Sequence, residues 1–219
     1  MATLKELIAK ENNEVLCLGN EAIARGAIEA SVQVFAAYPG TPSSEASMAL
    51  NAAAPKLGFY AEWSANEKVA LETAFAASIS GVRAMTAMKH VGVNVAADAL
   101  YSMTYMGTKG GLVILVADDP HMFSSQNEQD SRWLGVPAQI PILEPSNPHE
   151  AKKMTKMAFD ISEKFEMPII LRSTTRISHA RADVKFEKFE SKYREGEFDG
   201  TNRFKCLPAP VSYTHLRAH

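Results

Sequence analysis

The stretch EWSANEKVALE, residues 62–72, holds a glutamate that allows two interpretations. Ser64 precedes Glu67 by three residues, which is the spacing of a capping box that closes the start of a helix. Alternatively, Glu67 is an acid placed to exchange a proton with a bound molecule. The residues that share its helical stripe are small or apolar, namely Ala70, Leu71, Ala74 and Ser78. A carboxyl group among them is partly desolvated, which suits a proton donor.

Glu150 offers a comparison within the same chain. The segment Asn147-Pro148-His149-Glu150 has the same spacing from cap to glutamate, and the helix expected behind it is amphipathic. We therefore interpret Glu150 as an ordinary surface cap. Residues 73–81, behind Glu67, carry no charge. That helix is predicted to be buried on nearly every side, which favours the functional interpretation of Glu67.

Three more polar loops follow apolar, strand-like segments: YPGTPSSE at 38–45, MKHVGVN at 88–94 and ADDPHMFSSQNEQD at 117–130. Each has an ordinary explanation, since prolines, glycines and serines form turns and a charged strand end is usually solvated. We assign no defined role to Gln126 and Asn127 in the third loop. Because the carboxyl ends of parallel strands meet at one edge of a sheet, we expect these loops to converge with the loop before Glu67.

Strand-like and helix-like segments alternate along most of the chain. The expected strands are the short apolar runs at 15–19, 32–39, 59–63, 83–89, 111–118, 140–145 and 168–174. This alternation predicts an α/β fold with a mostly parallel sheet and helices on both faces. After Arg181 the chain is charged and poorly periodic. We expect one domain over residues 1–180, then 181–219 as a linker or the truncated start of a next unit, with a last stretch that could be non-native.

The bulk composition argues against several classes of protein. The chain has 46% hydrophobic and 22% charged residues and a net charge of −2, typical of a soluble globular protein and without the basic excess of nucleic-acid binders. No apolar run is long enough to span a bilayer. The two cysteines, Cys17 and Cys206, form no pair motif, which favours a reducing cytoplasm. His121 and His149 lack metal-ligand spacing, so no metal site is expected here.

Several motifs, in their order along the chain, resemble one enzyme family. They lie between residues 15 and 179 and read YPGTPSSE, EWSANEKVALE, AMKHVGVNVAADAL, ADDPHMFSSQNEQD, LEPS and RSTTRISH. Together they resemble the N-terminal part of the alpha subunits of indolepyruvate:ferredoxin oxidoreductases, which are thiamine-diphosphate-dependent 2-oxoacid:ferredoxin oxidoreductases. The resemblance implies a thiamine-diphosphate-binding fold, of which this chain is the pyrimidine-binding domain.

Cofactor and substrate contacts follow from this resemblance, motif by motif. The family's catalytic glutamate hydrogen-bonds N1′ of the aminopyrimidine, and Glu67 occupies its position, which implies both a catalytic and a cofactor-binding role. The resemblance also implies that Pro39 lies against the cofactor and that the Thr41 hydroxyl approaches the substrate.

The substrate carboxylate requires a cation or hydrogen-bond donors. In pyruvate-type relatives an arginine supplies them from the loop in which this chain has Asp118 and Asp119. This difference argues against pyruvate as the substrate. It leaves Lys89 or His90 as the expected substrate-binding contacts.

The resemblance implies the oxidative decarboxylation of an aryl 2-oxoacid, such as indolepyruvate, with coenzyme A and ferredoxin, in anaerobic amino-acid catabolism. The chain has no Gly-Asp-Gly start for a diphosphate site, and two cysteines cannot supply [4Fe-4S] clusters. We therefore expect this segment to bind neither Mg²⁺ nor the clusters and to be inactive alone. The resemblance implies that both lie in C-terminal domains of the same subunit, and that a beta subunit completes the enzyme. Two alternatives remain open, a different 2-oxoacid or a non-catalytic small-molecule-binding α/β module.

Overall fold

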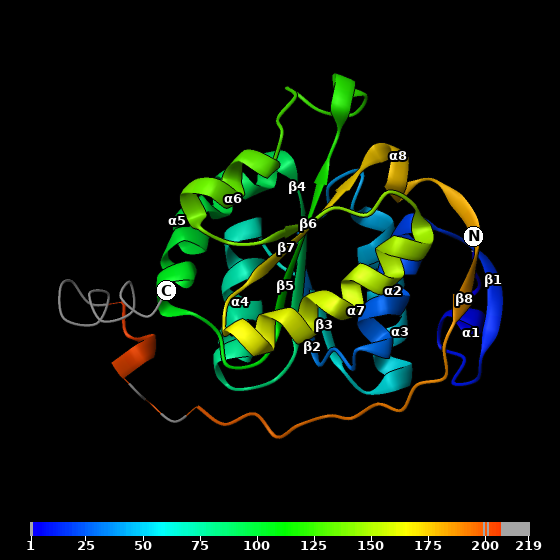
Figure 1. Ribbon diagram of the computed structural model, residues 1–219, viewed down its shortest axis with the longest axis horizontal. Helices are drawn as coiled ribbons and strands as arrows, with labels where there is room; N and C mark the ends of the chain where they lie inside the picture. The colour runs from blue at the N-terminus through cyan, green and yellow to red at the C-terminus, as the bar shows by residue number, and fades with distance from the viewer. Residues whose placement is uncertain (1, 199, 201, 207–219) are drawn as a thin grey trace.

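The computed structural model describes residues 2–198, 200 and 202–206. A six-stranded parallel sheet forms its centre, in the order β3-β2-β4-β5-β7-β6 (Figure 1). The strands are β2 (Val34–Ala37), β3 (Tyr60–Trp63), β4 (Ala84–Lys89), β5 (Leu112–Asp118), β6 (Ile142–Leu143) and β7 (Ile169–Thr174). From β2 the chain passes to β3 on one side and then to β4 on the other. The strand order therefore reverses between β2 and β4, and such a switch point opens a crevice at the carboxyl ends of the strands.

Helices cover both faces of the sheet (Figure 1). One face carries α2 (Gly19–Glu29), α3 (Ser44–Leu57) and α7 (Pro148–Phe165), and the other carries α4 (Glu67–Ile79), α5 (His90–Met106) and α6 (Arg132–Ala138). Strand β5 is apolar throughout because both of its faces are covered: Val113 and Leu115 face the first layer, and Ile114 and Val116 face the second. The predicted α/β fold with a parallel sheet is confirmed. Within the described residues, no helix combines the length and apolar character needed to cross a bilayer.

One expectation near the start of the chain is wrong. β1 (Asn13–Leu18), expected in the main sheet, pairs antiparallel with β8 (Arg181–Phe186) in a separate two-stranded sheet. The segment after residue 180, expected as a linker or the truncated start of a next unit, begins with β8. A short apolar run looks the same in either sheet, and its partner lies at the far end of the sequence. The domain boundary itself stays a prediction, and the suspected non-native stretch at 207–219 lies outside the described residues.

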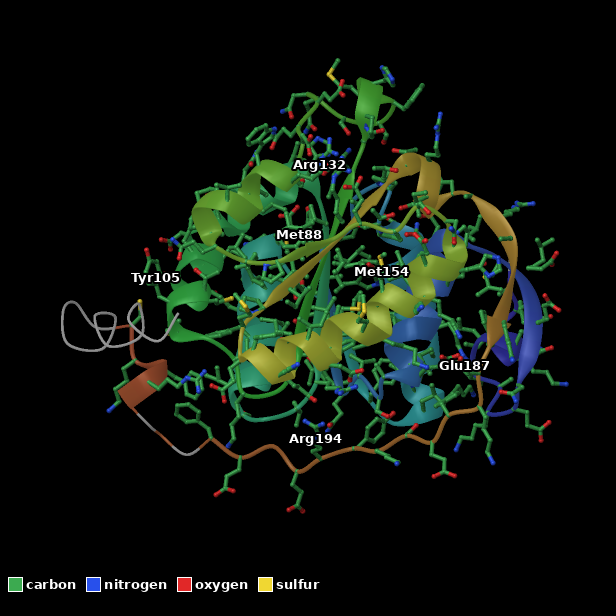
Figure 2. The ribbon with its side chains drawn as sticks, in the orientation of Figure 1. Met88, Tyr105, Arg132, Met154, Glu187 and Arg194 are labelled. Atoms are coloured by element: carbon green, nitrogen blue, oxygen red, sulfur yellow. The ribbon has the colours of Figure 1, made fainter. Side chains whose placement is uncertain are left out.

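The segment after β8 runs beneath the helices toward the opposite side of the molecule (Figures 1 and 2). Arg194, labelled in Figure 2, forms an ion pair with Glu163 of α7 at 2.7 Å. Its backbone N–H and carbonyl bind the side chain of Gln33, just before β2. This segment therefore passes the amino ends of the central strands, away from the crevice. The remaining short helices are α1 (Leu4–Leu7), η1 (Pro120–Met122), α8 (Thr175–Ser178) and η2 (Asn202–Phe204).

Candidate functional site

An open cleft of about 600 Å³ lies at the carboxyl edge of the sheet. Four loops line it, each following a different strand: Tyr38, Pro39 and Gly40 after β2, Glu67 after β3, Lys89 and Val91 after β4, and residues 122–126 after β5. The cleft thus lies at the switch point, where doubly wound proteins bind their ligands. The predicted convergence of the four loops is confirmed.

Glu67 is the first residue of α4 and closes no capping box. Asn66 caps the helix instead, since its side-chain oxygen accepts the Val69 N–H at 3.0 Å. The Ser64 hydroxyl donates to Glu62 at 2.6 Å. The capping-box interpretation is wrong because serine and asparagine cap helices equally well, and the true cap stands two residues later.

Glu150 behaves as a capping glutamate does. Asn147 caps α7 and accepts the Glu150 N–H at 2.9 Å. The Glu150 carboxylate accepts the N–H and the hydroxyl of Ser146, both at 2.8 Å. The backbone bond, followed by the hydroxyl bond, lowers the pKa of Glu150. The Glu67 carboxylate, by contrast, makes no hydrogen bond or ion pair with any residue that the structure describes.

The Glu67 side chain is half-buried and lies against the first turn of α5. A methyl group added to Gly92 would stand 2.5 Å from Oε1 of Glu67. Glu67 begins a helix of 13 residues, and His90 begins the neighbouring helix of 17 residues. The carboxylate therefore lies beside two helix N-termini, whose dipoles favour negative charge.

Lys89 is the last residue of β4 and lines the same cleft. Its ammonium group donates to the Ser124 carbonyl in the loop after β5. On the other side, a methyl group added to Gly40 would stand 2.9 Å from Cβ of Lys89. Among the described residues that line the cleft, Lys89 carries the only positive charge.

The structure brings Pro39, Glu67 and Lys89 together, but Thr41 and His90 are not part of the cleft lining. Thr41 is exposed, one residue past the lining residue Gly40. His90 is fully buried, and its Nε2 lies 3.0 Å from the Asn127 carbonyl oxygen. Lys89 is thus the better placed of the two proposed carboxylate contacts.

Asp118 holds the far end of the loop after β5 and Asp119 holds its middle, roles that could not be predicted from the sequence. The Asp119 carboxylate accepts the Ser124 N–H at 2.8 Å and the Ser125 hydroxyl at 2.5 Å. Burial alone would raise the pKa of Asp119, but these two bonds, a bond from the Thr175 hydroxyl and the charge of Lys89 together lower it. Asp118 is buried and accepts the Ser131 N–H at 3.0 Å.

This anchored loop presents two apolar side chains beside the cleft. Phe123 is 79% exposed and Met122 is 47% exposed, with Tyr38 at 39% among the lining residues after β2. Met122 and His121 have left-handed backbone angles, φ 56° and 66°, which non-glycine residues adopt only where the surroundings hold them. Sequence analysis missed Met122 and Phe123 because polar residues dominate the loop.

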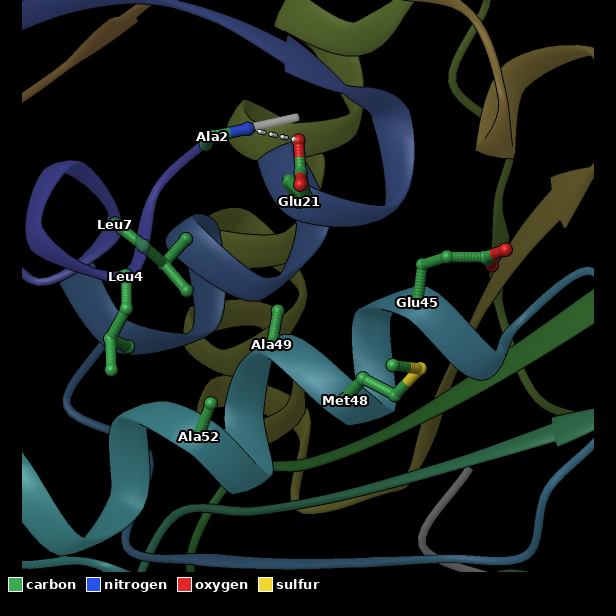
Figure 3. A pocket seen from close by; sticks show the side chains of 8 residues that line it. All are labelled: Ala2, Leu4, Leu7, Glu21, Glu45, Met48, Ala49 and Ala52. Carbon is green, nitrogen blue, oxygen red and sulfur yellow. Dashed lines mark hydrogen bonds between the residues drawn. The ribbon is translucent and has the colours of Figure 1, made fainter.

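A smaller pocket of about 170 Å³ lies between α1 and α3 (Figure 3). Its walls are mostly apolar, and none of the predicted site residues lines it. Of its two carboxylates, Glu21 accepts the N–H groups of Ala2 and Leu18. Glu45 points away from the apolar walls in Figure 3 and accepts from Asn20 at 2.8 Å. This pocket is therefore structural, and the cleft at the switch point is the candidate site.

No group of three or more His, Cys, Asp and Glu residues in the described part of the chain could hold a metal ion.

Comparison with known proteins shows the family of this chain. Residues 25–211 match the family described as pyruvate flavodoxin/ferredoxin oxidoreductase, thiamine-diphosphate-binding. Two subunits called indolepyruvate oxidoreductase subunit IorA are close relatives. That of Thermococcus kodakarensis is 58% identical over 100% of this chain and 34% of its own length. That of Archaeoglobus fulgidus is 59% identical over 83% of this chain and 30% of its own length. The chain thus spans about a third of the length of these relatives.

A solved structure shares the fold. The 2-oxoglutarate:ferredoxin oxidoreductase of Magnetococcus marinus, solved with 2-oxoglutarate, coenzyme A and succinyl-CoA, superposes with a TM-score of 0.71 at 19% identity. The match covers 81% of this chain and 32% of the other. The predicted resemblance to the indolepyruvate oxidoreductase subunits is confirmed by the family match and the two relatives together. The chain therefore belongs to the pyruvate flavodoxin/ferredoxin oxidoreductase family, whose thiamine-diphosphate-binding domain it matches over most of its length.

Proposed function

We propose that this chain supplies the pyrimidine half of a thiamine diphosphate site in a cytoplasmic enzyme. The complete enzyme oxidatively decarboxylates aryl 2-oxoacids of the indolepyruvate type to acyl-CoA, with ferredoxin as electron acceptor. One observation carries the proposal. The Glu67 carboxylate lines a cleft at the switch point and binds no described residue. A half-buried carboxylate without a protein partner is poised to accept a hydrogen bond from a ligand. The names of the close relatives support the choice of reaction.

The residues of the cleft fit an aminopyrimidine ring. Glu67 would hold the proton shared with N1′, and Pro39 would contact the ring. Gly92 and Gly40 leave room for the Glu67 and Lys89 side chains beside the ring. Thiamine diphosphate, when bound, supplies a carbon nucleophile and an electron sink for decarboxylation. The Glu67 carboxyl group would hold a proton at N1′ of the ring through this hydrogen bond.

Lys89 is proposed to bind the substrate carboxylate. One of its three N–H donors is used by Ser124, so two remain for a ligand. Tyr38, Met122 and Phe123 are proposed to receive the substrate side chain, since exposed aromatic and thioether groups bind aryl rings well. Thr41 and His90 remain predictions for substrate contacts, and neither lines the cleft.

A different 2-oxoacid is the nearest competing function. The 2-oxoglutarate synthase subunit KorA of Methanocaldococcus jannaschii is 30% identical over 76% of this chain. A dicarboxylic substrate would call for a second cation. The described lining residues supply Lys89 alone and three large apolar groups instead, which favours an aryl side chain.

The remaining parts of the reaction are assigned to other segments. The curated relatives are about three times longer than this chain. We assign the diphosphate site, Mg²⁺ and the [4Fe-4S] clusters to the rest of such a longer subunit and to a beta subunit. Coenzyme A and ferredoxin would bind the assembled enzyme.

The test is Glu67→Gln in the complete enzyme, with Glu150→Gln as the matched control. Glutamine keeps the size of the side chain but cannot share a proton with N1′. Exchange of the cofactor C2 proton, followed by NMR, should slow by about 10²–10⁴-fold, as expected for lost acid–base catalysis. Thermal unfolding should hardly change, because Glu67 has no bond to lose. Unchanged exchange in Glu67→Gln would remove the basis for the proposal.

A further inference from the structure

We infer that Gly92 is a positioning residue, whose missing side chain sets where the Glu67 carboxylate lies. This inference rests on the function proposed for Glu67. A Cβ atom at residue 92 would stand 2.5 Å from Oε1, 2.6 Å from Cγ and 2.8 Å from Cδ of Glu67. Real Cβ atoms essentially never approach other heavy atoms so closely. With the Glu67 side chain in this position, residue 92 therefore has to be glycine.

The helix backbones cannot move apart to relieve such an overlap. Gly92 lies in the first turn of α5, with Val93 and Ala96 fully packed behind it. On the α4 side, the Asn66 cap fixes the helix start, and Ala70 is fully buried. Because packed interiors deform little, the rotatable side chain of Glu67 has to give way.

No hydrogen bond or ion pair with a described residue holds the Glu67 carboxylate. Its position beside α5 therefore depends on the close packing that Gly92 allows. A catalytic acid or base acts only within hydrogen-bond reach of its target atom, and a shift of about 1 Å costs on the order of 10²-fold in rate. A methyl group at residue 92 therefore acts on catalysis through Glu67.

Helix propensity does not explain a glycine at residue 92. Alanine stabilises a helix interior better than glycine does. On propensity alone, Gly92→Ala would thus be neutral or stabilising, and glycine here would bring no benefit. The benefit comes from the space that it leaves above α5 for Glu67.

The experiment uses the complete enzyme and four variants: Gly92→Ala, Glu67→Ala, the double variant of these two, and Asn94→Ala as a control. Asn94 is exposed and lies two residues further along α5. The readouts are C2-proton exchange by NMR, the dissociation constant of thiamine diphosphate by calorimetry, and thermal unfolding.

We expect Gly92→Ala to slow C2-proton exchange by about 10–10²-fold and Asn94→Ala to leave it unchanged. In the Glu67→Ala background, the further change to Gly92→Ala should have no effect, since no side chain remains to displace. Normal exchange in Gly92→Ala overturns the inference, and so does a loss that persists without the Glu67 side chain. If Gly92→Ala alone does not fold, the double variant should fold, because removing Glu67 relieves the overlap. A double variant that also fails to fold overturns the inference.

The inference and the proposed function can fail separately. Normal exchange in Glu67→Gln would remove the proposed function and the inference with it. Impaired exchange in Glu67→Gln with normal exchange in Gly92→Ala would leave the function and remove only the role of Gly92.

Discussion

Replacement of Lys89 by methionine tests how the substrate is held. Methionine keeps most of the length and the apolar stem of lysine but loses the charge. Lys89 is half-buried and is the only cation among the described lining residues. The lost interaction is a charge-assisted hydrogen bond to a carboxylate, worth about 1.5–3 kcal/mol. The value of kcat/KM for the 2-oxoacid should therefore fall by about 10- to 150-fold.

The same substitution also removes the bond from Lys89 to the Ser124 carbonyl, so a second readout is needed. The dissociation constant of thiamine diphosphate reports on the cleft without any 2-oxoacid present. If Lys89 acts through the substrate, this constant should change little while kcat/KM falls. Lys68→Met is the matched control, because Lys68 pairs with Glu72 and Asp98 on the outer face of the helices. A normal kcat/KM in Lys89→Met refutes the assignment, and a loss confined to His90→Gln would move the contact to His90.

Two further predictions concern the side-chain pocket and the completeness of the site. Phe123→Ala should lower kcat/KM for an aryl 2-oxoacid by about 10-fold or more, from roughly 1.5–3 kcal/mol of lost apolar contact. Turnover of a 2-oxoacid with a small aliphatic side chain should not change, and equal losses for both substrates would contradict a specificity role. The isolated 219-residue chain should bind thiamine diphosphate weakly or not at all in calorimetry, whereas tight, magnesium-dependent binding would show that the described cleft is more than half of the site.

The fold could be predicted from sequence because its signals are local. Short apolar strands alternate with helices, and each strand of the main sheet ends in a polar loop, so the parallel sheet and its convergent edge follow from neighbouring residues. The pairing of β1 with β8 could not be predicted in this way, because it joins residues from opposite ends of the chain. Local pattern identifies a strand, but only tertiary structure identifies the sheet to which it belongs.

Only those features of the candidate site that depend on neighbouring residues could be predicted from the sequence. The position of Glu67 at the start of a buried helix is a local property. The Glu67 carboxylate would close a capping box only if Ser64 were the helix cap, but Asn66 is the cap. Serine and asparagine are equally common as helix caps, so the sequence could not decide between them. The exposure of Phe123 also escaped prediction, since it depends on how Asp119 folds the loop back on itself.

The two charged side chains of the cleft share one structural device. Glu67 rests on Gly92 and Lys89 rests against Gly40, and in each pair the glycine belongs to the loop or helix that follows a different strand. In the sequence these glycines suggest only turns, yet neither has the positive φ that would require glycine. What requires glycine is the close approach of a neighbouring charged residue across the switch point. The glycine in YPGTP reflects a contact between the neighbouring strands β2 and β4, and the glycine in KHVG reflects a contact between the segments that follow β3 and β4, which flank β2. These two contacts explain how the carboxylate and the cation proposed to act on the ligands converge on one cleft.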